Sequence, residues 1–382
     1  MKIILAIIFY FSFILFCSAY ETKEVINKLD DSVHFIDDLL NAPESSLFET
    51  DKEDIQNDID DFLDELFEIL EISDAIKHRD NYKKLEEKIL DEKNIISELE
   101  QEKIFAPEKS EMNLSKLIPD SKYTSSIKEI VAETKSDYQN IINIKKTNIE
   151  SYENELERIA QSISDALSEK SINLDTEQVK LWLSSAVGDD ILSMSVIFSN
   201  IKEITIQLEE LTKSSGENLN FAKKYYGMVV ILHKLIIHMQ QKFISKSKNE
   251  ILPKLSSFQK EAKANLKEAK KLLSQDKSNK LLKANIKSNE LTLNAIKLYS
   301  KVISNQMKKV KNSLKISKRE EKIAINTYKT VKLSSSVTNL IRNGLKTFDT
   351  LSKLQVPDIT RFENKEMQEE FRKLTVRIVP TS

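Results

Sequence analysis

Almost nothing in this chain interrupts a helix. Four glycines and six prolines are spread over 382 residues, and these two residue types break helices most strongly. Between them, apolar side chains recur every three or four residues, which is the spacing of one face of a helix. We therefore predict an all-α fold, an elongated antiparallel bundle of long helices with coiled-coil (heptad) packing.

The breaks in this pattern divide the chain into segments. The clearest heptad run lies in residues 191–211, after a capping-box pair formed by Asp175 and Gln178. The acidic helical pattern that begins near Ile55 continues towards Phe105, and a bend is expected near His78. The predicted segments are a secretory signal peptide (1–19), acidic N-terminal helices (20–105), a proline-containing loop (106–121), central long helices (122–252), basic C-terminal helices (253–356) and a tail (357–382).

The first residues have the order of a secretory signal peptide. Lys2 precedes an unbroken apolar run over residues 3–16, and the small residues of 17–19 follow. Cleavage is expected after Ala19, which predicts a secreted or periplasmic protein. The run is shorter than the roughly 20 residues that span a bilayer, and an uncleaved anchor is the alternative. Because Cys17 is the only cysteine, the mature chain would contain neither disulfides nor thiolate metal sites.

Charge is distributed unevenly along the chain. Residues 20–110 contain 28 acidic and 11 basic side chains, whereas residues 242–346 contain 26 basic and 7 acidic ones. One interpretation is that the two regions lie against each other and neutralise. The other is that the basic region meets an anionic surface, and export favours lipid over nucleic acid as that surface.

The segment 219–245 contains the most apolar stretch after the signal sequence, "YYGMVVILHKLIIHM". One helical face is apolar, and the other face is mixed: it carries His233, Lys234, His238 and Lys242 together with Val230 and Ile237. We interpret this segment as a core helix, with membrane insertion as the alternative. His233 and His238 are five residues apart and do not share a face, so no metal site is predicted. The residues expected to be either core or membrane-facing are Tyr225, Met228, Val229, Leu232, Leu235, Ile236, Met239 and Phe243.

Residues 374–378 of the tail alternate apolar and polar side chains, which is a strand pattern. Such a strand could add to the edge of a partner's sheet, whereas the plainer interpretation is a packed or irregular terminus.

No catalytic or cofactor-binding residue is predicted. The glycines are too scattered for a phosphate-binding loop. Asp189 and Asp190 are sequence neighbours and point apart on a helix. Trp182 is expected to anchor the core.

The function expected from these patterns is that of an exported structural or interaction protein. It would act as a scaffold or adaptor at the cell envelope, binding a protein partner or a second copy of itself. The alternative is a membrane-active protein, because long helices around an apolar segment resemble the layout of α-helical pore-forming toxins. A ligand-sensing bundle is the third class. We expect neither enzymatic activity nor nucleic-acid binding.

Overall fold

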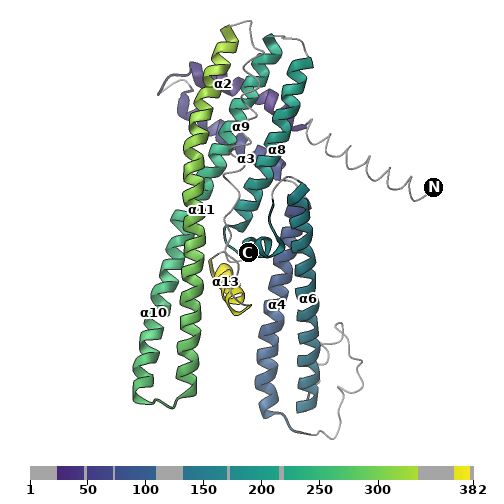
Figure 1. The fold of residues 1–382 in the computed structure, drawn as a ribbon, viewed down its shortest axis with the longest axis vertical. Coiled ribbons are helices and arrows are strands. Elements are labelled where there is room, and N and C mark those ends of the chain that lie inside the picture. The colour runs from purple at the N-terminus through teal and green to yellow at the C-terminus, as the bar shows by residue number, and fades with distance from the viewer. Residues whose placement is uncertain are drawn as a thin grey trace, which may run out of the picture. The chain divides into compact units, whose positions relative to one another are not determined.

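The computed structural model describes residues 24–46, 50–71, 74–108, 132–169, 173–214, 219–333 and 365–378. Every regular element in these ranges is helical, which confirms the all-α prediction for the described chain. The signal peptide and most of the predicted loop 106–121 lie outside them. Residues 24–32 are helical, and the further helices are α2 (His34–Asn41), α3 (Lys52–Glu71), α4 (Asp74–Phe105), α6 (Lys135–Glu169), α7 (Thr176–Leu183), α8 (Gly188–Ser214), α9 (Leu219–Lys246), η2 (Ser247–Ile251), α10 (Leu252–Gln275), α11 (Lys280–Leu333) and α13 (Lys365–Ile378) (Figure 1).

The helices form two compact units. One unit holds the described parts of residues 1–73 and 184–382, and the other holds residues 74–169 and 173–183. The segment expected to run from Ile55 towards Phe105 with a bend near His78 is two separate helices, α3 and α4, which belong to different units.

The smaller unit is the helix pair α4 and α6, with α7 packed against it. Lys103 of α4 donates to Gln139 at the start of α6, whereas Glu92 accepts from Asn148 further along, so the two helices run in opposite directions. Asp175 and Gln178 bond to each other's backbone N–H groups, both at 2.9 Å, which is the predicted capping box at the start of α7. Trp182 of α7 is buried.

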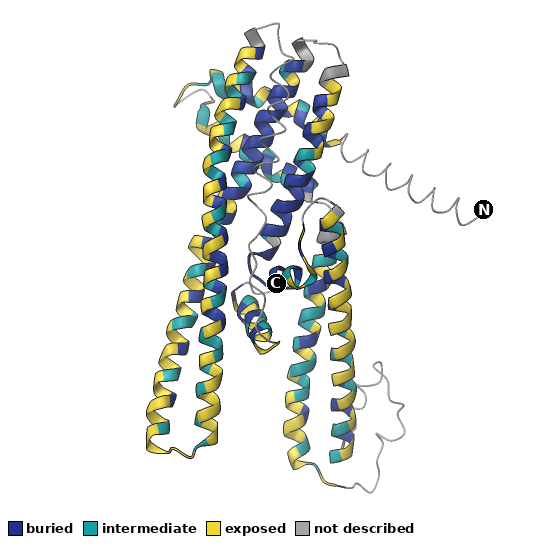
Figure 2. Ribbon diagram, viewed as in Figure 1, coloured by how far each residue is buried: buried dark blue, intermediate teal, exposed yellow. Residues whose placement is uncertain are grey.

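The larger unit is organised around α9, which contacts α2, α3, α8 and α11. Lys234 meets Glu321 and Gln240 meets Ser313, so α9 and α11 are antiparallel neighbours. Figure 2 shows that α9 is buried along most of its length. Contact on several sides is what a helix with apolar residues on both faces needs.

The chain stays helical past Pro253, where the sequence suggested a boundary. A proline inside a helix lacks the N–H group that bonds to the carbonyl four residues earlier, and its ring collides with that carbonyl. Here the wider π-helical turn η2 precedes it, and Leu252 N–H bonds to Ser247 O five residues back. This turn relieves the conflict, so α9, η2 and α10 form one continuous helical path.

A short turn after α10 reverses the chain, and α11 packs back against it as a hairpin (Figure 1). Buried alanines line its interface, namely Ala262, Ala269 and Ala295. Small side chains allow the two helices to approach closely.

The tail is a helix, α13, so the alternating pattern at residues 374–378 does not form the possible strand. Its buried side chains are Met367, Phe371, Leu374 and Ile378, which follow helical spacing. Val376, the middle apolar residue of the alternating pattern, is 36% exposed. The alternation therefore does not correspond to one buried face.

Candidate functional site: the basic α10–α11 hairpin

The eight residues of α9 proposed from the sequence as core or membrane-facing all lie inside the larger unit. None of them is more than 6% exposed. Val230 and Ile237, which the sequence places on the opposite face, are buried as well. The apolar surface of α9 is therefore covered by neighbouring helices in this structure.

Three of the four polar residues on the other face of α9 are also enclosed, whereas Lys242 is exposed. His233 is 3% exposed rather than solvated, and burial lowers its pKa to about 4 because the charged form would lose its water. Lys234 Nζ lies 3.1 Å from Glu321 Oε1 of α11, with both side chains largely buried. His238 Nε2 lies 2.7 Å from Asp64 Oδ1 of α3.

Lysines of α9 neutralise acidic residues near the N-terminus. Lys223 pairs with Asp37 at 3.0 Å, and Lys224 pairs with Asp30 at 2.6 Å. Lys242 pairs with Asp64. Direct neutralisation of acidic residues therefore does occur. The lysines that provide it lie in α9 more than in the basic region that follows α9.

The α10–α11 hairpin carries many basic side chains that take no part in these α9 pairs. Residues 260–290 contain nine lysines and four acidic residues, and all nine lysines are exposed. On α10, Lys260, Lys263 and Lys267 are three and four residues apart, so they form a stripe along one face. Figure 2 shows this part of the hairpin as largely exposed along both helices.

Hydrogen bonds organise the turn at the end of the hairpin. Asp276 accepts from the backbone N–H of Ser278 at 3.2 Å and from its hydroxyl at 2.7 Å. Asn279 Oδ1 accepts from Leu282 N–H at 3.0 Å, which caps the start of α11. The hydrogen bonds that Asp276 accepts from Ser278 and from the Asn279 side chain lower its pKa, so its carboxylate stays ionised while it holds the turn.

Two leucines at this turn face solvent. Leu272 is 43% exposed and Leu281 is 70% exposed. Their neighbours Leu273 and Leu282 are half-buried. Leu272 and Leu281 were not among the residues singled out from the sequence. The adjacent leucine pairs on either side of the turn were the available signal. Adjacent residues on a helix point about 100° apart, so the two leucines of a pair do not face the same way.

Helix α13 supports the base of the hairpin. The rings of Tyr299 in α11 and Phe371 in α13 have centroids 3.9 Å apart. On the α10 side, Lys254 donates to the carbonyl of Ile378 at 2.7 Å, and Arg377 lies over the ring of Phe258 at 4.0 Å. The base of the hairpin is thus anchored by a third helix, which leaves the lysine-rich end exposed.

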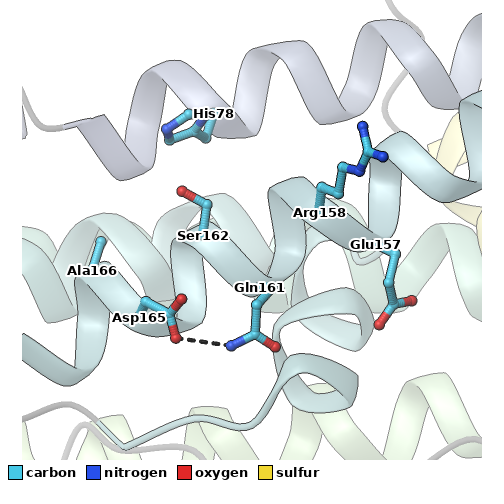
Figure 3. A pocket seen from close by; sticks show the side chains of 7 residues that line it. All are labelled: His78, Glu157, Arg158, Gln161, Ser162, Asp165 and Ala166. Carbon is cyan, nitrogen blue, oxygen red and sulfur yellow. Dashed lines mark hydrogen bonds between the residues drawn. The ribbon is translucent and has the colours of Figure 1, made fainter.

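A shallow groove of about 660 Å³ lies between α4 and α6. His78 and Ser162 point towards each other across it, as Figure 3 shows. Most polar groups along its rim are used within the smaller unit: Gln161 donates to Asp165 at 2.8 Å and accepts from Thr176 at 2.6 Å. The groove therefore offers few unused polar groups to a ligand.

Other candidate positions from the sequence have local structural partners. Asp190 at the start of α8 pairs with Lys246 at 2.9 Å. Among the described side chains, no group of three or more His, Cys, Asp or Glu residues could hold a metal ion. Within the same residues, no helix is long and apolar enough to cross a membrane.

Comparison with known proteins gives no relative. No protein-family model matches the chain, and neither a curated protein nor a solved structure matches it.

Proposed function

We propose that this protein is an exported, non-enzymatic interaction protein that acts as a scaffold or adaptor at the cell envelope. Its helices form an elongated antiparallel bundle with heptad packing, and its main binding surface is the lysine-rich end of the α10–α11 hairpin. The observation that carries this proposal is the row of nine exposed lysines on residues 260–290.

The surroundings of these lysines support a binding role. Exposed charges of one sign repel one another, and each ion pair at a protein surface contributes little stability. The hairpin nevertheless keeps nine lysines against four acidic residues, while Asp30, Asp37 and Asp64 are paired with lysines of α9. A strongly basic surface of this kind attracts an anionic partner and accelerates its association.

The alternative, a membrane-active protein that inserts α9, receives less support. Its insertion would require all eight apolar residues named above to leave the core. It would also break the Lys234–Glu321 pair, and separating a largely buried pair is costly. Burial therefore favours a structural role for α9, and the hairpin is the surface that we propose for binding.

Photocrosslinking in the producing cells would test the proposal. A photoreactive residue is placed at Lys267 or Lys287 in the hairpin, and at Lys311 or Lys315 of α11 as matched exposed controls. We expect the chain in the envelope or secreted fraction, with discrete protein or lipid adducts concentrated at the hairpin positions. Retention in the cytoplasm, or equal labelling at hairpin and control positions, would contradict the proposal.

A further inference from the structure

We infer that the partner of the hairpin is an anionic lipid bilayer, which the hairpin end contacts peripherally while α9 remains in the core. This inference rests on the proposed function, because it names the class of partner for the same surface. We call residues 270–283 the hairpin tip.

Charge at the tip is almost entirely positive. It contains five lysines, of which Lys270 pairs with Glu290 at 2.9 Å, and its one acidic residue is Asp276, whose carboxylate is engaged in holding the turn. Lysines near an anionic membrane each contribute to attraction, and several together produce binding that salt weakens.

The second observation is the apolar pair between these lysines. Leu272 at the end of α10 and Leu281 at the start of α11 are both exposed, and the Asp276 and Asn279 hydrogen bonds fix the turn that separates them. Apolar side chains set among lysines suit the boundary between headgroups and acyl chains, where the leucines enter hydrocarbon and the ammonium groups stay with phosphates.

The chemistry of the basic side chains distinguishes lipid from nucleic acid. All basic residues from 252 to 318 are lysines, and the next arginine after Arg158 is Arg319. Lysine acts as a point charge, whereas the guanidinium of arginine forms the paired hydrogen bonds typical of specific phosphate and base recognition. The tip also lacks aromatic side chains on which bases could stack. Diffuse attraction to a headgroup layer needs neither feature.

Co-flotation of the full chain with vesicles tests this inference. The vesicles are phosphatidylcholine alone, or phosphatidylcholine with 30% phosphatidylglycerol, at about 0.1 M and 0.5 M salt, which shortens the screening length from about 10 Å to less than half of that. We expect flotation with the anionic vesicles at the lower salt and much less at the higher salt. Equal flotation with neutral vesicles would overturn the inference, because an apolar segment such as residues 1–19 would then be responsible.

Two tip variants and two controls locate the contact. K271E/K277E/K280E should weaken partitioning roughly 100-fold, on the basis of the attraction of each lysine. L272S/L281S should weaken it roughly tenfold while the charge is unchanged. The control K311E/K315E/K322E changes net charge by the same amount far from the tip, and I323S removes a single exposed apolar residue of α11. Both controls should retain most of the binding, and circular dichroism should show unchanged helicity throughout.

The outcomes separate this inference from the proposed function. Equal losses in tip and control variants would overturn the tip contact. Absence of flotation, together with protein adducts at Lys267 and Lys287, would overturn the lipid partner and leave the interaction proposal standing. Binding to duplex DNA without flotation at the same salt would likewise overturn the inference.

Discussion

Replacing Gly227 with alanine should destabilise the larger unit, although alanine is the better helix former. A Cβ atom at this position would lie 2.5 Å from Cγ1 and 2.9 Å from Cγ2 of Val33. Carbon atoms in contact normally stay about 3.5 to 4.0 Å apart. Gly227 therefore marks a close approach between α9 and the turn that precedes α2.

The expected magnitude is a balance of two effects. Alanine in place of glycine inside a helix stabilises by about 1 kcal/mol. Overpacking a core costs about 1 to 3 kcal/mol, and the upper end applies because Val33 is buried and its β-branched side chain has few rotamers. We expect G227A to lower the free energy of unfolding by about 2 kcal/mol.

A double-mutant cycle in urea, followed by far-ultraviolet circular dichroism, tests this reasoning. V33A alone should cost about 2 kcal/mol because two buried methyl groups are lost. In V33A/G227A the new methyl group occupies the space left by the valine, so the double variant should lose less than the sum of the single losses by at least about 1.5 kcal/mol. A stabilising G227A, or additive losses, would refute the close approach.

Three further predictions follow from the buried polar groups of the larger unit. Because His233 stays neutral in the folded state with a pKa of about 4, whereas an unfolded histidine has a pKa near 6.5, the unfolded state gains a proton first as pH falls. Unfolding free energy should then decrease between pH 6.5 and 4 by about 3 kcal/mol more in the wild type than in H233Q, and equal pH slopes in urea titrations would contradict this. K234M should cost about 3 to 5 kcal/mol by leaving Glu321 unpaired, whereas K234M/E321L should recover most of the loss; a double variant as unstable as K234M would rule this out. The Tyr299 hydroxyl accepts a hydrogen bond from the Ala186 N–H and lies 2.7 Å from Thr375 Oγ1 of α13. Y299F should therefore cost about 1 to 3 kcal/mol and speed hydrogen exchange in α13; unchanged exchange there would show that the Tyr299–Thr375 contact does not hold the helix.

Much of the helical architecture could be predicted because the patterns that indicate a helix lie in residues close together in the sequence. Apolar spacing identified the long helices, and the reciprocal bonds of Asp175 and Gln178 occur as the capping pattern predicts. The same local reasoning failed at the tail. Five alternating residues resemble a strand, and only the longer window that includes Met367 and Phe371 shows the helical period that packing against α11 uses.

Features that depend on tertiary packing could not be predicted. No glycine or proline marks the boundary between α3 and α4, which separates the two units. The π-helical turn before Pro253 depends on both flanking helices being held in place. Pairing of the acidic N-terminus with α9, and exposure of Leu272 and Leu281, likewise follow from which helices become neighbours.

Hydrogen–deuterium exchange of the full chain, with and without anionic vesicles, tests the central claim most directly: α9 is core and the hairpin is the binding surface. We predict that amides of residues 225–243 exchange among the slowest in both conditions, and that vesicles slow exchange only around residues 270–283. Loss of protection in residues 225–243 when vesicles are added would contradict the account, because it would show that α9 leaves the core to meet the membrane.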